Sequence, residues 1–355
     1  MPGELVTKYK VTQSHTNRVE AIALEIENKN EHRVEPKDEQ FLSTSPWQIM
    51  DDDFEIESKK NAIKELYRDI ISDDKTIDFH QSEKTYFYRN KMEYALYYDF
   101  ESEKILPAVH ARGSHQKLPV TKSSIERPEI WQKVIEIIKK LNEEKADGRK
   151  YQSLLLRCNQ NGEVSGGLYV NHEPHQKFDN LSDELLDVKY SYSPNGFFQI
   201  NLPVYEEVLK RIKELLKDSD KILDLYSGVG TIGLSVARDK DLTLVEVDKS
   251  AYVELENNTK GLENAKPILA KSEEVLDYIT PDSVVILDPP RAGCDKKLID
   301  KLLEVHPKQI IYLSCNPATQ ARDVKMLLES YKLNTIEGYN FFPKTPHIEC
   351  LVSLA

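Results

Sequence analysis

The stretch 310–319, with the sequence IIYLSCNPAT, constrains the fold of this chain more than any other. Its mostly apolar first half is typical of a buried strand, and Asn316-Pro317 forces a turn before a helix predicted over 319–330. Cys315 is therefore predicted at the carboxyl end of a parallel strand, beside a helix N-terminus. Open α/β sheets bind ligands at that edge, and the helix dipole favours a thiolate there. Taken alone, the stretch fits a nucleophile and a buried structural cysteine equally well.

The composition argues against membrane spans and against a disulfide framework. The 355 residues suffice for two or three domains. No run of about 18 apolar residues occurs, the N-terminus lacks the apolar core of a signal peptide, and the four cysteines have no paired spacing. We therefore expect a cytoplasmic protein. Its net charge of −12 means that any surface for nucleic acid must be a local basic patch.

The pattern of elements divides the chain into three parts. Residues 1–50 are polar and predict a short N-terminal β segment. Residues 51–185 begin with an amphipathic helix over 53–71 and continue with alternating, tyrosine-rich strands, which predicts an α+β domain. Over 186–355 helices and strands alternate, so we expect a Rossmann-like, doubly wound parallel sheet with an antiparallel last strand. Its expected strands are 221–226, 242–247, 266–270, 283–287, 309–313 and 348–354.

A glycine-rich loop follows the first strand of that sheet. The segment 224–233 contains the pattern G-x-G-x-x-G from Gly228, and Glu246 ends the next strand, where a carboxylate that binds ribose belongs. This pattern leaves a nicotinamide-dependent oxidoreductase open. Asp224, four residues before the first glycine, and the Asp-Pro-Pro-Arg turn at 288–291 favour an S-adenosylmethionine enzyme instead.

Five motifs stand in order along the second half of the chain. They are SPNGFFQIN at 193–201, the glycine loop at 224–233, DPPR at 288–291, SCNP at 314–317 and FPKTPHIEC at 342–350. Together they resemble the RNA uracil-C5 methyltransferase family, which makes 5-methyluridine in tRNA or ribosomal RNA. The close resemblance covers 190–355, and YRNKME at 88–93 agrees more loosely. Each motif alone is a weak signal, whereas five in this order are specific.

The resemblance implies roles for single residues. Cys315 matches the nucleophile, Glu349 matches the base, and Phe197 matches an aromatic residue that lies by the target base. The positions that match contacts to the cofactor S-adenosylmethionine are Gln199, Tyr226, Gly228, Thr231, Glu246 and Asp288. Thr231 departs from the asparagine that is common at its position.

The chemistry of uridine methylation demands the same residue types. C5 of uracil is a poor nucleophile, and a thiolate that adds to C6 makes C5 reactive toward a methyl sulfonium group. The C5 proton must then leave so that the thiol can be eliminated, which needs a general base. Cys315 and Glu349 fit these two tasks, although a lone Glu is otherwise an ordinary carboxylate at a strand edge.

The N-terminal part departs from the family pattern. Many members carry a small β-barrel and a four-cysteine iron–sulfur site, but Asp38, Thr44 and Trp47 stand roughly where the first three cysteines would fall. We therefore expect no cluster and no other metal, and we interpret residues 1–50 as a remnant of the barrel. RNA contacts are then expected from tyrosines of the middle domain, which interleave with basic residues: Tyr86, Tyr88, Tyr94, Tyr97 and Tyr98 with Arg89 and Lys91. A sheet core explains about half of these tyrosines equally well.

These observations predict a monomeric, S-adenosylmethionine-dependent enzyme that methylates C5 of a uridine in RNA. The lack of cluster ligands favours a T-loop uridine of tRNA over a uridine of 23S ribosomal RNA. Two alternatives stay open: a nicotinamide-dependent oxidoreductase, and an RNA-binding protein that keeps the fold without turnover. The presence of both Cys315 and Glu349 argues against the second alternative, because a binding protein needs neither.

Overall fold

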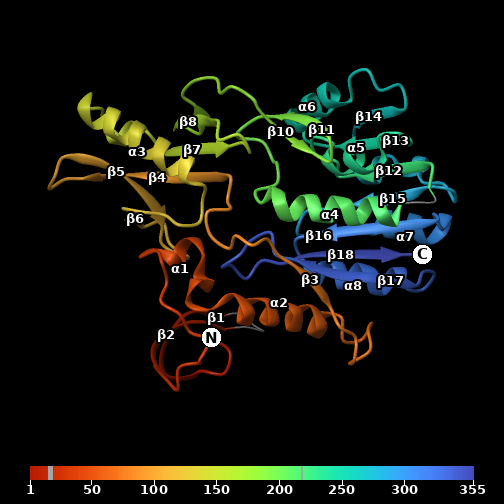
Figure 1. The fold of residues 1–355 in the computed structure, drawn as a ribbon, viewed down its shortest axis with the longest axis horizontal. Coiled ribbons are helices and arrows are strands. Elements are labelled where there is room, and N and C mark those ends of the chain that lie inside the picture. The colour runs from red at the N-terminus through yellow and green to blue at the C-terminus, as the bar shows by residue number, and fades with distance from the viewer. Residues whose placement is uncertain (15–18, 217–218) are drawn as a thin grey trace.

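The computed structural model describes residues 1–14, 19–216 and 219–355, and its largest element is an eight-stranded sheet (Figure 1). The strand order is β14-β13-β12-β15-β16-β18-β17-β3. Strands β14 to β16 pair in parallel, and β18 runs antiparallel between β16 and β17. The strands are β3 (Asp78–His80), β12 (Lys221–Leu225), β13 (Asp241–Glu246), β14 (Ala265–Leu269), β15 (Val284–Leu287), β16 (Gln309–Ser314), β17 (Leu333–Tyr339) and β18 (Glu349–Leu354). The predicted Rossmann-like sheet with an antiparallel last strand is confirmed.

Helices cover both faces of this sheet, because its central strands are apolar on both sides. Ile286 points into a core with one helical layer, and its neighbour Val285 points into the core on the opposite face. The first layer consists of α4 (Leu202–Leu215), α5 (Thr231–Ala237) and α6 (Lys249–Thr259). The second layer consists of α2 (Asp52–Leu66), α7 (Lys296–Val305) and α8 (Pro317–Leu327).

Two elements from the first quarter of the chain belong to this sheet. Strand β3 pairs in parallel with β17, with Asp78 opposite Glu337 and His80 opposite Tyr339. Helix α2 buries Ile63 in the core that α8 also lines. We expected residues 51–185 to form one middle domain, but in the structure β3 is a strand of the large sheet and α2 packs against that sheet.

The middle part of the chain forms an antiparallel sheet of order β6-β5-β4-β7-β8-β9, with α3 on one face. The elements are β4 (Lys91–Asp99), β5 (Lys104–His110), β6 (Lys117–Pro119), α3 (Pro128–Glu143), β7 (Ser153–Cys158), β8 (Val164–Val170) and β9 (Glu173–Pro174). Two of the tyrosines that we considered for RNA contact are core residues. Tyr94 is fully buried beneath α3 and donates a hydrogen bond to Glu126, and Tyr88 is buried and donates one to the Pro343 carbonyl at 3.0 Å. Neither ring can stack on RNA, whereas Tyr97 and Tyr98 are half-buried.

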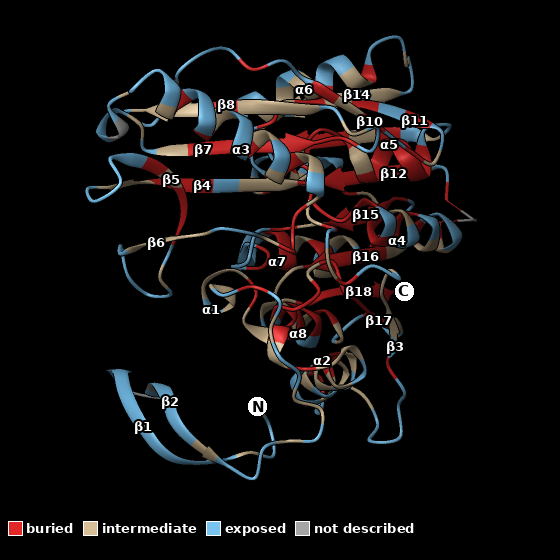
Figure 2. Ribbon diagram, turned by 60° about the vertical axis from the view of Figure 1, so that its left-hand side comes forward, coloured by how far each residue is buried: buried red, intermediate tan, exposed pale blue. Residues whose placement is uncertain are grey.

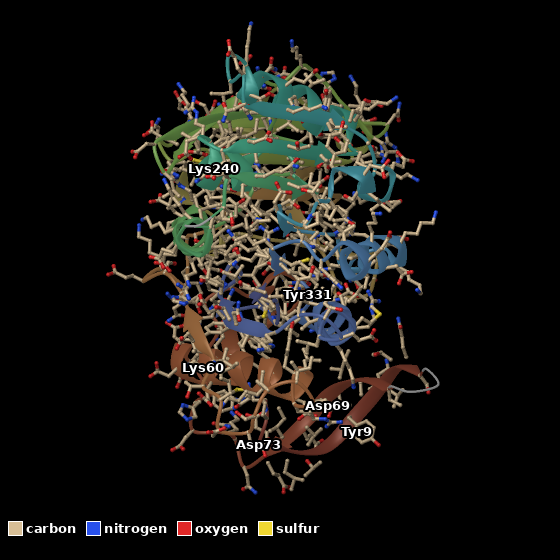
Figure 3. The ribbon with its side chains drawn as sticks, turned by 90° about the vertical axis from the view of Figure 1, so that its right-hand side faces the viewer. Tyr9, Lys60, Asp69, Asp73, Lys240 and Tyr331 are labelled. Carbon is tan, nitrogen blue, oxygen red and sulfur yellow. The ribbon has the colours of Figure 1, made fainter. Side chains whose placement is uncertain are left out.

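Short elements connect the two sheets and precede them. The hairpin β10 (Leu181–Leu185) and β11 (Val188–Tyr192) packs on the α4 layer. The N-terminal strands β1 (Leu5–Ser14) and β2 (Val19–Glu27) pair with each other and are exposed over almost their whole length (Figure 2). Figure 3, where Tyr9 marks this hairpin, shows it at one end of the molecule. The predicted N-terminal β segment is thus present as a hairpin, and its origin as a barrel remnant stays a prediction.

The segment between the hairpin and α2 contains α1 (Phe41–Thr44) and is held by a buried carboxylate. Asp38 accepts hydrogen bonds from the Ser124 hydroxyl at 2.6 Å and from Gln48 Nε2 at 2.8 Å, which joins this segment to the middle domain. Within the described ranges, no three His, Cys, Asp or Glu side chains lie where they could hold a metal ion. No helix of the described part is long and apolar enough to cross a membrane.

Candidate active site

The antiparallel last strand brings Cys315 and Glu349 together. In the pairing of β16 with β18, Leu313 lies opposite Leu351 and Ser314 lies opposite Cys350. The next pair in this register is Cys315 and Glu349. Cys315 is half-buried at the predicted turn into α8, which covers Pro317–Leu327 and so begins two residues before the predicted start at 319. A thiol and a carboxylate from motifs far apart in the sequence therefore share one edge of the sheet.

Three carboxyl groups at this edge lie in surroundings that favour their protonated forms. Burial raises the pKa of Asp224 to about 8, that of Asp288 to about 7, and that of Glu349 well above its ordinary value. The negative charge of Asp288 raises the pKa of the other two further. Arg291 opposes the rise at Glu349, and the Gly233 amide opposes it at Asp224. These carboxyls form a cluster that is short of positive charge.

The thiol of Cys315 is also held in its protonated form. Burial raises its pKa, and the charges of Glu349 and Asp288 raise it further, while the Arg291 guanidinium lowers it. Our expectation that the helix N-terminus favours a thiolate is therefore outweighed by burial and by two nearby carboxylates. Arg291 in turn donates to His347 Nδ1 at 2.8 Å, and burial lowers the pKa of His347, which favours the neutral imidazole.

A cavity of about 330 Å³ opens beside Cys315. Its polar wall is formed by Cys315, Arg291, Asn316 and His347. The remaining lining is apolar and includes two residues of α2: Ala62, Leu66, Pro317, Ala318, Pro346 and Ile348. The Asn316 amide donates to the Arg291 carbonyl at 2.8 Å, which fixes the two turns against each other. The size and mixed lining suit a planar, polar ring such as a nucleobase.

The glycine loop joins β12 to α5 and closes on two carboxylates. The Gly233 amide donates to Asp224 Oδ2 at 2.8 Å, and a Cβ atom at Gly233 would lie 2.8 Å from that same oxygen, so only glycine fits. At the other end of the loop, the Gly228 amide donates to Glu246 Oε2 at 2.8 Å. The second oxygen of Asp224 is buried and has no hydrogen-bond partner among the described residues. The loop is therefore built around two carboxylates, and Asp224 has an oxygen with capacity for a further donor.

Comparisons with known proteins point to one family. The family model described as tRNA (Uracil-5-)-methyltransferase matches residues 259–355. An uncharacterized RNA methyltransferase of Bacillus cereus is 27% identical over 419 residues, which covers 100% of this chain and 90% of that protein. The family model thus matches the C-terminal part of this chain, and the relative that spans the whole chain is named an RNA methyltransferase.

Other relatives match less of their own length or show the fold alone. An uncharacterized RNA methyltransferase of Enterococcus faecalis is 38% identical over 185 residues, 49% of this chain, and the chain spans 40% of that protein's length. The crystal structure of Pyrococcus abyssi tRNA (uracil-54, C5)-methyltransferase in complex with S-adenosyl-L-homocysteine superimposes with a TM-score of 0.80. The alignment has 23% identity and covers 99% of this chain and 93% of that chain, so the two share a fold.

The structure separates the residues that the family pattern singles out into several groups. Cys315, Glu349 and Asp288 lie together, and Gly228 and Glu246 meet in the loop. The Thr231 hydroxyl is already hydrogen-bonded to the Tyr205 hydroxyl at 2.7 Å. The remaining positions keep their assignments as predictions: Gln199 is buried, Tyr226 has a positive φ of 66° with its hydroxyl near Ser272, and Phe197 is 69% exposed.

Most residues that line the cavity had no assigned task in the sequence, among them Ala62, Leu66 and His347. Ala62 and Leu66 come from α2, where a helical repeat of apolar residues indicates only burial. His347 stands two residues before Glu349 within a motif of the family pattern, and this position was the only indication in the sequence that His347 lies at the site. Its contact with Arg291 shows that two motifs meet there.

Proposed function

We propose that this chain transfers a methyl group from S-adenosylmethionine to C5 of a uridine in RNA. The observation that carries this proposal is the strand register that puts Cys315, which lines the cavity, opposite the buried Glu349. Uridine-C5 methylation needs a nucleophile for C6 and a base for the C5 proton. We favour a T-loop uridine of tRNA as the target, because the structurally similar Pyrococcus protein is named for uracil-54 of tRNA.

The residues of the glycine loop suit S-adenosylmethionine. The unpartnered Asp224 oxygen and the raised pKa values of Asp224 and Asp288 mark a site that lacks positive charge. S-adenosylmethionine carries positive charge on its ammonium and sulfonium groups, and when bound it supplies an electrophilic methyl group. Asp224 and Glu246, with the glycine amides between them, would hold it through hydrogen bonds and charge.

In this proposal, the side chains around the cavity perform three proton and bond transfers. Cys315 gives up its proton to solvent water, and its sulfur bonds to C6 of the base while the C5–C6 π electrons move toward O4. C5 then forms its bond to the methyl carbon, and the bond from that carbon to the sulfonium sulfur would break, with its electron pair left on sulfur as S-adenosylhomocysteine. Glu349 takes the C5 proton, and the C6–S bond breaks to restore the double bond and the thiolate. The surroundings that raise the pKa of Glu349 make its ionised form a stronger base for that step.

We further propose that the enzyme acts as a monomer in the cytoplasm. Its four cysteines are free and scattered, which suits a reducing compartment. Size-exclusion chromatography with light scattering tests the oligomeric state.

The function is tested by incubating the purified protein with S-adenosylmethionine labelled in its methyl group and with transcripts of tRNA and of 23S ribosomal RNA. We expect 5-methyluridine in the T-loop of tRNA, detected by nucleoside mass spectrometry after nuclease mapping. Label in ribosomal RNA alone would show that the substrate is ribosomal RNA and not tRNA. Label in neither RNA, from a protein that binds S-adenosylhomocysteine, would contradict the proposal.

A further inference from the structure

The loop 340–347 joins β17 to β18 and leads directly into the residues of the cavity. His347 ends the loop, and Glu349 follows two residues later, at the start of β18. Three parts of the chain hold its backbone by hydrogen bonds. Tyr88 of the middle domain donates to the Pro343 carbonyl at 3.0 Å, the Trp47 amide donates to the Lys344 carbonyl at 3.0 Å, and Asn201 donates to the Phe341 carbonyl at 3.2 Å.

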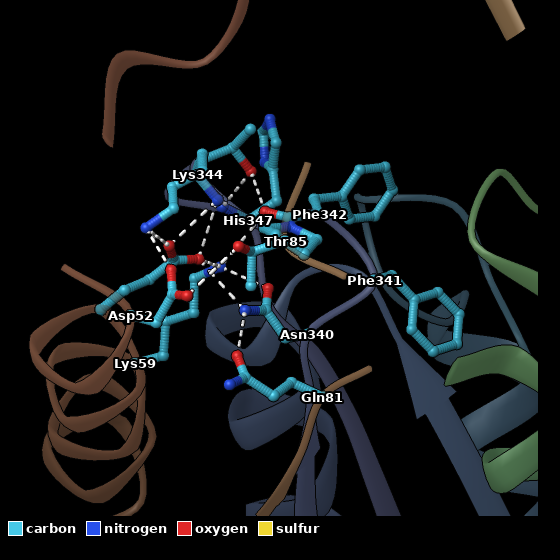
Figure 4. Close-up of polar contacts among 12 residues, drawn as sticks. Asp52, Lys59, Gln81, Thr85, Asn340, Phe341, Phe342, Lys344 and His347 are labelled. Atoms are coloured by element: carbon cyan, nitrogen blue, oxygen red, sulfur yellow. Dashed lines mark hydrogen bonds and ion pairs between the residues drawn. The ribbon is translucent and has the colours of Figure 1, made fainter. Parts of the chain in front are cut away.

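Three charged residues of α2 and one of the loop form a network (Figure 4), which we call the Lys59–Lys344 cluster: Asp52, which is partly exposed, and the buried Glu55, Lys59 and Lys344. The two lysines are 0% and 2% exposed. Lys59 Nζ donates to Glu55 Oε1 at 2.8 Å, to Asn340 Oδ1 at 2.7 Å and to the Phe342 carbonyl at 3.2 Å. The cluster thus ties α2 to the loop at several atoms.

Lys344 is the residue at which the loop turns. Its φ of 63° lies in the left-handed region that disfavours side chains. Its amide donates to both oxygens of Glu55, at 2.9 and 3.0 Å. Its ammonium group donates to the Met50 carbonyl at 3.0 Å and pairs with Asp52. The unusual backbone conformation is therefore held by charged groups of α2 and the residues just before it.

An apolar contact would attach α2 to the sheet at lower cost, because burying paired charges gives up much of their hydration. Directional hydrogen bonds instead fix the position of single backbone atoms in the loop, because Glu55 accepts from the Lys344 amide and Lys59 donates to the Phe342 carbonyl. None of the four cluster residues lines the cavity beside Cys315. Their effect on the site must therefore pass through the loop.

We propose that the Lys59–Lys344 cluster positions the loop so that His347 holds Arg291 and Glu349 faces Cys315. This inference rests on the methyltransferase function proposed above. The four members are positioning residues, since they act through the loop and touch neither the thiol nor the base. Because Trp47, α2 and the middle domain all meet the loop, the N-terminal half of the chain sets the geometry of the carboxyl group that removes the proton.

The test uses Lys344→Met in the full-length chain. This change keeps an unbranched stem and leaves the buried Glu55–Lys59 pair intact, while Asp52 is partly exposed to water. Arg211→Met is the matched control, because it removes an ion pair with Glu337 between α4 and β17 and leaves the loop bonds in place. Both proteins are compared with wild type for kcat, KM for RNA, binding of S-adenosylhomocysteine, and hydrogen–deuterium exchange of the segment 340–349.

For Lys344→Met we expect kcat to fall by about 100-fold, which is the cost of a misplacement of about 1 Å at a reacting group. KM for RNA and cofactor binding should stay at the wild-type values, and exchange in 340–349 should rise, whereas Arg211→Met should show none of these changes. A Lys344→Met protein with native kcat, or with native exchange in the loop, would overturn the proposal. The proposal would also be overturned if only KM for RNA changed, or if the fall in kcat equalled the fraction of Lys344→Met protein that is unfolded. Hydrogen–deuterium exchange is measured without turnover. If the proposed reaction is wrong, the wild-type protein is itself inactive. If only the positioning proposal is wrong, the wild type is active and Lys344→Met shows native exchange or native kcat.

Discussion

The fold contains two groups of buried carboxylates, one with cationic partners and one without. In the Lys59–Lys344 cluster, Glu55 faces two lysines and accepts the Lys344 amide with both oxygens. At the edge of the sheet, Asp224 and Asp288 are buried without a cationic side chain that lowers their pKa values, which rise to about 8 and about 7. The first group is neutralised within the protein, and the second is left short of positive charge.

The difference separates charges that support the fold from charges that serve a ligand. A paired buried carboxylate contributes defined geometry, and removing one partner is costly because the other charge stays buried. An unpaired buried carboxylate destabilises the free protein in its ionised form and gains from a cationic ligand. The predictions below change residues of these two groups or of the glycine loop beside Asp224, and the two groups should respond differently.

The largest effect is expected at Glu349, on the ligand side of the comparison. Glu349→Gln keeps the shape but removes the base, so turnover should fall by about 10²- to 10⁴-fold, the contribution of a general base. Addition of Cys315 and methyl transfer do not need this carboxylate, so a methylated RNA–protein adduct should accumulate and appear as a shifted band under denaturing conditions. A less stable protein without any adduct would remove Glu349 from the mechanism.

On the structural side, Glu55→Gln should lower the free energy of unfolding by about 3–5 kcal/mol, since Lys59 would stay buried without its counter-charge. Urea denaturation followed by circular dichroism measures this change. Glu57→Gln, on the same helix, is the matched control and should leave stability close to wild type. A loss below about 1 kcal/mol would show that the cluster is not held by charge pairing.

Asp288→Asn should instead raise the free energy of unfolding, by an amount that depends on pH. The folded-state pKa of about 7 lies above the ordinary value of 3.8, so the folded protein binds more protons and wild-type stability falls as pH rises from about 4 to about 7. The variant lacks this loss, and its advantage should be near zero at pH 4 and reach up to about 4 kcal/mol at pH 8. Thermal unfolding at the two pH values measures it; an equal effect at both would contradict the raised pKa.

The smallest effect is expected at Glu246, which accepts the Gly228 amide in the loop. Glu246→Ala should weaken binding of S-adenosylhomocysteine by about 1–3 kcal/mol, the usual range for a hydrogen bond to a charged group. Isothermal titration calorimetry measures this loss, and wild-type protein titrated with NAD is the comparison. Tight binding of NAD would reopen the oxidoreductase alternative.

Much of the catalytic edge could be predicted from local sequence. The apolar run before Cys315, the Asn-Pro turn and the glycine loop each follow from short-range rules, and the structure places them as expected. The three-residue strand β3 and its pairing with β17 were not predicted, because so short a strand has no periodicity and its partner lies far along the chain. A sheet core was one of the two explanations for the tyrosines, but the sequence did not single out Tyr88 and Tyr94, since alternation predicts two faces without saying which is covered.

The charges of the site were harder still to predict. The sequence places a helix N-terminus at Cys315, which favours a thiolate, but it does not show that Glu349 and Asp288 lie close enough to raise the pKa of the thiol. Likewise, Lys59 has the pattern of a solvated helix face, and its burial follows only from the position of the loop. Long-range packing decides both.

The central claim is that Cys315 bonds to C6 of a uridine, and trapping that bond tests it most directly. A tRNA transcript with 5-fluorouridine in the T-loop, incubated with S-adenosylmethionine, replaces the proton that Glu349 must remove with fluorine, which cannot leave as a proton. We expect a complex that survives denaturant, with mass spectrometry of the digested protein placing the RNA on Cys315, and no complex with Cys315→Ala. A complex that persists in Cys315→Ala, or wild-type protein that methylates normal tRNA but forms no complex with the fluorinated transcript, would contradict the account.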